Sequence, residues 1–282
     1  MDYGGATLEY NDAYTVIAKG TSVMTYYDQH VHTHFSFDSE AQFADYLRQT
    51  GNPFVTTEHL EMSNPDDHGG DNTPAYAEYV AEEDTLQRRF PNQLLRGIEI
   101  GYYAPRLDAI RRYLAAGDYD LTLLSFHHDG HYDYQDEHFL TVDLEQHVRG
   151  YYAAMLAGIR QFGDFDVLAH FDYGLRVLDV APTQLADWAG DTLREILRVI
   201  IEQNVAFELN TKSMYRWHDA PLYDMVLDWY LELGGKLLTL GSDAHASDKF
   251  ESDFAAARAL LTRHNVHELA TFRRHVPTIV AI

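Results

Sequence analysis

Two pairs of metal-capable side chains, each separated by a single residue, are the first feature of this sequence that could do chemistry. His30 and His32 form one pair, and Asp243 and His245 form the other. Residues i and i+2 of a strand point to the same face, so both members of a pair can reach one ion. Imidazole and carboxylate together suit zinc, iron and manganese. We therefore expect a site for divalent metal, and the sequence leaves the identity of the ion open.

Further histidines and carboxylates fall at the ends of the apolar or β-branched runs. The runs that we expect to be strands are 26–31, 54–57, 94–100, 121–126, 165–169, 205–209 and 237–240. At or near their carboxyl ends stand His30, His32, Glu58, His59, Glu99, His127, His128, His170, Asp172, Glu208, Asp243 and His245. Active-site residues of α/β barrels gather at the carboxyl ends of the strands. This recurrence favours one shared metal centre over scattered structural histidines.

Segments with helical periodicity separate the expected strands. They are 40–49, 75–90, 106–116, 142–162, 182–203 and 221–233. Strands that alternate with helices are typical of a parallel sheet or barrel. We predict an α/β domain over residues 24–282, with residues 1–23 as an N-terminal extension. The polar, Gly-rich stretch 64–73 is expected to be a long loop and a candidate lid.

Composition excludes several classes of protein. Hydrophobic residues make up 46 % of the 282-residue chain, which argues against disorder. No apolar run reaches the length of a membrane span, and no secretory signal is visible. The chain has no cysteine, so disulfides, thiolate zinc sites and cysteine nucleophiles are absent. The expected compartment is the cytoplasm.

The charge balance limits the partners. The formal net charge is -23, with 21 Lys and Arg against 44 Asp and Glu. A surface of this sign repels a phosphate backbone, so we expect neither nucleic acid nor a membrane as a partner. A nuclease would need a basic groove with stacking aromatics, and only the aromatics are present. We expect a small phosphorylated substrate, and a chain that is a monomer or a homodimer.

The order of the metal-capable residues resembles that of a known superfamily. The run Asp28-Gln-His-Val-His-Thr-His-Phe-Ser-Phe-Asp38 resembles the opening motif of the polymerase and histidinol phosphatase (PHP) superfamily. Matching pieces follow in order: Thr57-Glu-His59, Gly97-Ile-Glu99, Ser125-Phe-His127, Ala169-His170 with Asp172, and Gly241-Ser-Asp-Ala-His245. The resemblance covers nearly all of residues 24–250. The pieces Glu208-Leu-Asn-Thr211, ending in Arg216, and Gly97-Ile-Glu-Ile-Gly-Tyr102 are similar to the histidinol-phosphatase branch.

The resemblance implies a fold, a set of cofactors and a reaction. The fold is a distorted, TIM-like (βα)7 barrel of class α/β, and the cofactors are two or three divalent ions (Zn, Fe or Mn). The implied ligands are His30, His32, Glu99 and Asp243 for the first ion, Glu99, His127 and His170 for the second, and Asp38, His59 and His245 for the third. The implied reaction is hydrolysis of L-histidinol phosphate to L-histidinol and phosphate, in histidine biosynthesis. Another small phosphate ester or nucleotide, or a metal-binding module without activity, remains as an alternative.

The expected mechanism uses a metal-activated hydroxide as the nucleophile on phosphorus. Glu99 and Asp243 are the expected catalytic ligands. The general acid for the leaving alcohol is not assigned, and His128 or a metal-bound water is a candidate. The position expected for His128 is in solvent or behind the metal ligands.

Three cationic side chains are candidates for binding the phosphate group. Arg176 and Arg216 are the first candidates, because a guanidinium pairs with two phosphate oxygens, and Lys212 is the third. Lys212 begins a segment that departs from the family pattern, which often has a glycine there. The candidates for holding the cationic end of histidinol are Glu58, Asp172, Glu208 and the acidic loop 64–73. For Glu208, orienting the metal ligands is the alternative role.

The chain also contains a match to the motif of another phosphatase family. Asp118-Tyr-Asp120-Leu-Thr122 matches the D-x-D-x-T nucleophile motif of haloacid-dehalogenase phosphatases. That motif follows a hydrophobic strand in its own family, whereas here it follows a helical segment and a glycine. We therefore interpret it as the turn into the fourth strand. The G-x-S-x-G elbow of serine hydrolases does not occur.

Overall fold

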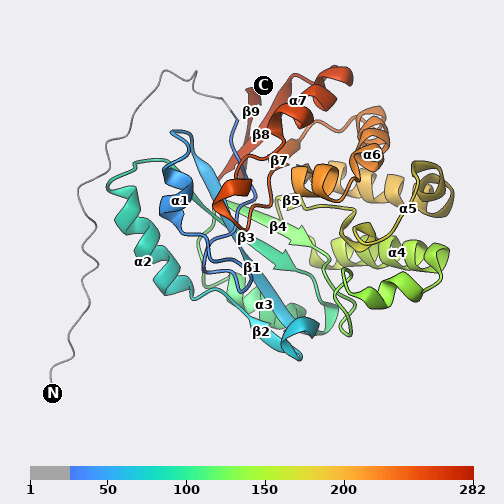
Figure 1. Ribbon diagram of the computed structural model, residues 1–282, viewed down its shortest axis with the longest axis horizontal. Coiled ribbons are helices and arrows are strands. Elements are labelled where there is room, and N and C mark those ends of the chain that lie inside the picture. Colours follow the sequence, from blue (N-terminus) through green and yellow to red (C-terminus); the bar gives the residue numbers. More distant parts are fainter. Residues whose placement is uncertain (1–25) are drawn as a thin grey trace.

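A seven-stranded sheet forms the centre of the protein. The computed structural model describes residues 26–282, so the expected extension at 1–23 and the expected domain start at residue 24 lie outside the described residues. The strands are β1 Phe54–Asn64, β2 Gly70–Asn72, β3 Leu94–Gly101, β4 Leu121–Ser125, β5 Val167–Leu168, β6 Ala206–Asn210 and β7 Leu238–Gly241. Their order is β2-β1-β3-β4-β5-β6-β7 (Figure 1). All neighbours are parallel except β2, which runs antiparallel to β1.

The expected first strand lies where a barrel requires it, although it is not a regular strand. Val31 forms isolated parallel bridges to Thr56 of β1 on one side and to Ala244, which follows β7, on the other. The backbone bonds of this segment to the β1 side are Val55 N to Asp28 O at 2.9 Å and Thr57 N to Val31 O at 2.7 Å. Those to the β7 side are Gln29 N to Leu240 O at 3.2 Å, Asp243 N to His30 O at 2.8 Å and His32 N to Ala244 O at 2.9 Å. Segment 28–32 therefore connects the two edges of the parallel strands, as expected for a distorted α/β barrel.

Helices surround the sheet. They are α1 Phe43–Leu47, α2 Tyr76–Gln87, α3 Leu107–Leu114, α4 Leu144–Phe162, α5 Pro182–Glu202, α6 Ala220–Glu232 and α7 Phe254–Arg263. Figure 1 shows α1 and α2 on one side and α4, α5 and α6 on the other. The first six agree with the expected helical segments, whereas α7 was not predicted. In α5, Pro182 occupies the first turn and the buried stripe includes Leu185, Leu193 and Ile196, so its apolar face packs into the core.

A C-terminal hairpin, which the sequence did not predict, closes the amino end of the strands. It consists of β8 Glu268–Arg273 and β9 Val276–Ala281. Ala270 and Phe272 of β8 join the interior cluster that includes Val55 and Val167. The side chain of Gln29 bonds to Ala270 O at 2.8 Å and accepts from Phe272 N at 2.9 Å. The opposite, carboxyl end of the strands is left for the site.

The expectation of a long loop at 64–73 is wrong. Strand β1 continues to Asn64, a short 3-10 turn follows at Pro65–Asp67, and β2 pairs back onto β1. The side chain of Asn64 accepts from Asp66 N at 3.0 Å, and Arg106 binds the carboxylate of Asp71 at 2.6 and 2.8 Å. These polar side chains form turn and cross-strand contacts, which is why a polar composition here does not mean an irregular loop.

No helix within residues 26–282 is both long and apolar enough to cross a membrane.

Candidate metal centre

Glu99, near the end of β3, lies at the centre of a group of histidines. Its Oε1 is 2.7 Å from Nε2 of His170 and 3.1 Å from Nε2 of His127. Its Oε2 is 3.0 Å from Nδ1 of His59. The same oxygen is 3.3 Å from Nε2 of His30 and 3.4 Å from Nε2 of His32. One carboxylate therefore faces the imidazole nitrogens of five histidines, which come from four separate segments of the chain.

Two further carboxylates, those of Asp243 and Asp38, lie beside Glu99, and each contacts one of the same histidines. Asp243 Oδ1 is 3.7 Å from Nε2 of His32 and 3.3 Å from Nδ1 of His245. Asp38 Oδ2 is 3.0 Å from Nε2 of His245 and 3.5 Å from Nε2 of His59. The structure thus brings together the members of each of the three expected ligand sets. Their assignment to particular ions remains a prediction.

The unsatisfied polar atoms of this cluster fit divalent metals. Nε2 of His30, Nε2 of His32, Nδ1 of His59 and Oε2 of Glu99 are buried and have no hydrogen-bond partner. Buried polar atoms without partners are costly, and a cation that these lone pairs could coordinate would compensate the cost. Four groups have ligand atoms within 4.8 Å of one another: His32, His59 and His245; His30, His170 and Asp243; His30, His32 and Glu99; and His59, Glu99 and His127. The donor set is nitrogen and oxygen, which suits zinc, iron and manganese.

Carboxylates behind the cluster orient its histidines. Glu208 of β6 accepts from Nδ1 of His30 at 2.6 Å and from the backbone N–H of His170 at 2.8 Å. Glu61 of β1 contacts Nδ1 of His127 at 2.7 Å. Such partners determine which ring nitrogen stays free to bind a metal. The sequence suggested this role for Glu208, but it did not predict Glu61, because the expected strand ended before it.

The local backbone permits these close approaches. A Cβ on Gly241 would lie 2.5 Å from Cβ of His30 and would collide with the carboxylate of Glu208, so only glycine fits between them. Asp243 follows with a positive φ of 52°, a conformation that non-glycine residues seldom adopt. Strain of this kind is typical of functional sites, where the surrounding structure holds a side chain in place.

The electrostatic environment keeps both central carboxylates ionised. Burial alone would raise the pKa of Glu99, but the nearby His30, His59 and His127 lower it well below its usual range. Burial likewise opposes ionisation of Asp243, but Lys212, His30 and Arg176 lower its pKa well below its usual range. Ionised carboxylates are the form that binds cations.

Two of the expected phosphate ligands lie at the cluster. Arg176 is buried, donates from Nε to Ser213 Oγ at 2.9 Å and pairs with Asp243 Oδ2 at 3.1 Å. Lys212 Nζ is 2.9 Å from Asp243 Oδ1. Both side chains line the small cavity, of about 50 Å³, that Glu99, His127 and His170 also line. They are therefore placed beside any phosphate group that enters it.

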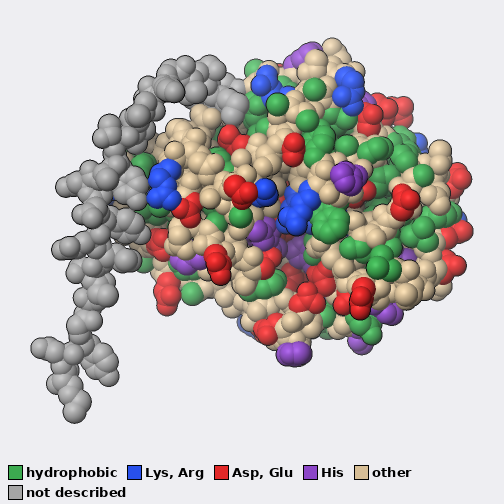
Figure 2. Space-filling model, viewed as in Figure 1, with side chains coloured by type: hydrophobic (Ala, Val, Ile, Leu, Met, Phe, Trp, Pro, Cys, Tyr) green, Lys and Arg blue, Asp and Glu red, His purple; other side chains and the backbone are tan. Residues whose placement is uncertain are grey.

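The third expected phosphate ligand, Arg216, lies farther out. It is exposed and lines a cleft of about 680 Å³ that shares Lys212, Asp243 and His245 with the metal cluster. Figure 2 shows histidine side chains in a hollow near the middle of this face, with Lys and Arg side chains above them. The cleft is therefore an approach to the metal centre.

His128 is not in solvent. It is 6 % exposed, and its Nε2 is 3.0 Å from Oε1 of Glu61, the carboxylate that also contacts His127. It does not line the small cavity. The alternative position, behind the metal ligands, agrees with this geometry, whereas its role as a general acid gains no support from it. His131, by contrast, is exposed.

Two of the acidic side chains suggested for the cationic end of the substrate are buried and have other partners. Glu58 accepts from Thr33 Oγ1 and Ser36 Oγ, both at 2.6 Å, and it supports the turn after His32. Asp172 is fully buried and accepts from Tyr223 Oη at 2.7 Å. The sequence could not show this, because both residues follow strands as ligands do.

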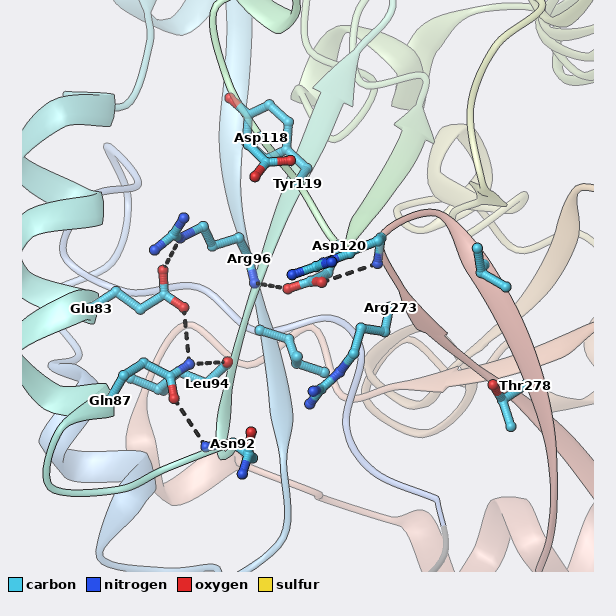
Figure 3. A pocket seen from close by; sticks show the side chains of 13 residues that line it. Glu83, Gln87, Asn92, Leu94, Arg96, Asp118, Tyr119, Asp120, Arg273 and Thr278 are labelled. Atoms are coloured by element: carbon cyan, nitrogen blue, oxygen red, sulfur yellow. Dashed lines mark hydrogen bonds and ion pairs between the residues drawn. The ribbon is translucent and has the colours of Figure 1, made fainter.

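The D-x-D-x-T motif lies at the other end of the sheet. Figure 3 shows Asp118, Tyr119 and Asp120 in a pocket near the start of β3, beside Arg96. The carboxylate of Asp120 accepts from the backbone N–H of Arg96 at 3.1 Å and of Arg274 at 3.0 Å. It connects β3 to the C-terminal hairpin, which supports the interpretation of this motif as a turn.

The parallel strands and the cluster at their carboxyl ends define an α/β protein with a candidate multinuclear metal centre. The model of the PHP domain family matches residues 28–212, and this chain belongs to that family. The match confirms the resemblance inferred from the histidine and carboxylate motifs.

Several known proteins are similar along most of the chain. The histidinol-phosphatase of Lactococcus lactis is 28 % identical over 254 residues, which cover 87 % of this chain and 93 % of that protein. A probable histidinol-phosphatase of Thermotoga maritima is 26 % identical over 259 residues, covering 89 % and 98 %. The crystal structure of histidinol phosphate phosphatase from Lactococcus lactis, complexed with Zn, L-histidinol and phosphate, matches with a TM-score of 0.80. It is 27 % identical and covers 89 % of this chain and 98 % of that chain.

Proposed function

We propose that this protein is a metal-dependent phosphomonoesterase that hydrolyses L-histidinol phosphate to L-histidinol and phosphate. The observation that carries the proposal is the convergence of five histidines on Glu99, with buried nitrogen and oxygen atoms that have no hydrogen-bond partner. The substrate is supported by the similarity to histidinol-phosphatases over more than four fifths of the chain. The PHP-type domain is proposed to extend over residues 24–282.

The chain's own residues have distinct tasks in this reaction. His30, His32, His59, His127, His170, His245, Asp38, Glu99 and Asp243 would hold two or three divalent ions. When bound, such ions supply an activated water near neutral pH and neutralise charge on the phosphoryl oxygens. Arg176 and Lys212 line the same cavity and would orient the phosphate group. Arg216 would meet it at the entrance from the cleft.

Zinc is the first choice of ion, since the similar crystal structure contains it, with iron and manganese as the other candidates. The reaction would belong to histidine biosynthesis in the cytoplasm, by a protein that is a monomer or a homodimer.

Phosphate release from L-histidinol phosphate tests the proposal. It should be measured beside a nucleoside monophosphate and an aryl phosphate, before chelation, after chelation and after addition of Zn, Mn or Fe. Activity that is lost on chelation, restored by metal and strongest on L-histidinol phosphate is the expected result. Activity on the other esters alone would support a metal-dependent hydrolase but would exclude L-histidinol phosphate as its substrate. Activity that chelation leaves unchanged would overturn the metal mechanism.

A further inference from the structure

The cleft beside the metal centre contains a buried donor that no described residue satisfies. Trp217 lines this cleft, and its indole Nε1 is buried without a hydrogen-bond partner. An indole N–H has only the capacity to donate, and leaving it unsatisfied in a buried place is unfavourable. A ligand that brings an acceptor atom to this nitrogen would remove the cost.

The same cleft contains a carboxylate that is also without a partner among the described residues. Asp253 precedes α7 at the N-cap position, where aspartate normally accepts a hydrogen bond from its own helix, but here its side chain makes no such bond. Its φ is 61°, in the left-handed region that a non-glycine residue seldom adopts. The carboxylate of Asp253 is therefore free to pair with a ligand in the cleft.

The other charged groups of the cleft, except Arg216, have partners. Lys212 is paired with Asp243, and Lys249 is paired with Asp248 at 2.8 Å. Arg216 lies with its Cζ 6.0 Å from the ring of Trp217, and we have placed it at the entrance for phosphate. Asp253 is therefore the available anionic group of this cleft.

The backbone connects both residues to the metal centre. Lys212–Arg216 form a π-helical turn, and the N–H of Trp217 bonds to Lys212 O at 3.2 Å at its end. Thr211 Oγ1 donates to Ser252 O at 2.7 Å, which attaches the residue before Asp253 to the end of β6. Single π-turns are frequent at functional sites.

We propose that this cleft is the subsite for the leaving group, in which Trp217 Nε1 donates to an acceptor nitrogen of an imidazole and Asp253 pairs with the ammonium group. The proposal rests on the proposed function, because L-histidinol phosphate carries these two groups beside its phosphate. It assigns the choice of substrate to Trp217 and Asp253, while the phosphate group meets the metal centre. Glu58 and Asp172, which the sequence suggested for the cationic end, are buried elsewhere.

Steady-state kinetics of Trp217→Phe and Asp253→Asn, in the metal-loaded full chain, test the subsite. We expect KM for L-histidinol phosphate to rise roughly 3–10-fold for Trp217→Phe, as for one lost hydrogen bond, and by more for Asp253→Asn, because the lost partner is charged. An aryl phosphate has neither group, so its kcat/KM should stay within about twofold. Trp188→Phe and Asp191→Asn, on α5, are the matched controls and should leave both substrates unchanged.

Two kinetic outcomes would overturn the subsite. One is an unchanged KM for L-histidinol phosphate in both variants. The other is an equal loss on both substrates, which would mean a structural or general catalytic role. Calorimetric binding of L-histidinol itself separates this proposal from the proposed function, because it needs no turnover. If the wild-type chain binds L-histidinol and both variants bind it more weakly, the subsite stands even if the phosphate ester is not hydrolysed. If the wild-type chain does not bind it, the subsite fails.

Discussion

Nδ1 of His30 lies 2.6 Å from Oε1 of Glu208, and both side chains are fully buried. Since a carboxylate can only accept, Nδ1 of the imidazole carries a proton, and Nε2 is the nitrogen that would bind a metal ion. That nitrogen faces Glu99, in the middle of the candidate metal centre. Glu208, which binds no metal in our proposal, therefore orients His30, which does.

Replacing Glu208 with Gln should weaken metal binding by roughly 10–100-fold, because partners of this kind orient the ligand and raise its basicity. Retention of zinc against a competing chelator measures the effect. The same change at the exposed Glu202, at the end of α5, is the control and should leave retention unchanged. Equal zinc retention in the Glu208 variant and the wild type would show that this carboxylate does not support metal binding.

Removal of metal should lower the stability of the folded chain. A ligand that binds only the folded state at 1,000 times its Kd stabilises it by about 4 kcal/mol. For a chain of this size that corresponds to a fall in Tm of roughly 10 °C on chelation. Thermal unfolding followed by circular dichroism measures it, with Glu99→Gln as a variant whose Tm should respond much less. A wild-type Tm that is indifferent to chelation would contradict the metal centre itself.

Arg176 should not be replaceable by lysine. Its guanidinium reaches Ser213 and Asp243 at once, which an ammonium group on a flexible stem does not reproduce. We expect Arg176→Lys to lower kcat by about 10²–10³, the usual cost of removing one preorganised donor from a reacting oxyanion. Arg198→Lys, at an exposed ion pair of α5, is the control. A loss of less than threefold in kcat would exclude Arg176 from the phosphate site.

The stability of the chain should depend on pH through Asp219. Burial and the neighbouring Asp172 raise the pKa of Asp219 to about 9, whereas an unfolded aspartate titrates near 3.9. Between these values only the folded state holds the proton, so stability falls as pH rises through this window. The slope for one proton cannot exceed about 1.4 kcal/mol per pH unit.

Asp219→Asn removes this proton and should lose less stability between pH 6 and pH 9 than the wild type. Both Tm values should be compared at each pH with the same saturating metal. Parallel curves for the two proteins would mean that Asp219 is ionised in the fold.

The D-x-D-x-T motif should be dispensable for catalysis. Asp118→Asn should leave kcat/KM within about twofold, because Asp118 is at the amino end of the sheet, far along the strands from Glu99. Asp120→Asn should instead lower the free energy of unfolding by about 1–3 kcal/mol, since an amide cannot accept as well from both backbone N–H groups. Loss of turnover in a folded Asp118 variant would instead support the alternative in which Asp118 is the nucleophile of a haloacid-dehalogenase phosphatase.

The sequence alone predicted much of the fold and the members of the cluster. Apolar runs alternate with helical periodicity, so the parallel order of β1 and β3 to β7 could be expected. Because the carboxyl ends of parallel strands meet, the sequence is enough to predict that His30, Glu99 and Asp243 lie close together. These inferences depend on local patterns and on the family resemblance, which the match to residues 28–212 confirms.

Other features depend on contacts between distant segments, and no local pattern reports those. Strand β9 has an exposed, uncharged run that pairs with β8 only because the hairpin docks at the amino end of the sheet. The role of Glu61 could not be predicted, because β1 extends to Asn64, beyond the apolar run 54–57 from which the strand was expected. Whether a carboxylate such as Glu58 is a ligand, a substrate partner or a hydrogen-bond acceptor depends on what three-dimensional packing places within about 3 Å of it. The sequence by itself therefore determined which side chains gather at the strand ends, and only the tertiary structure decided the partner of each one.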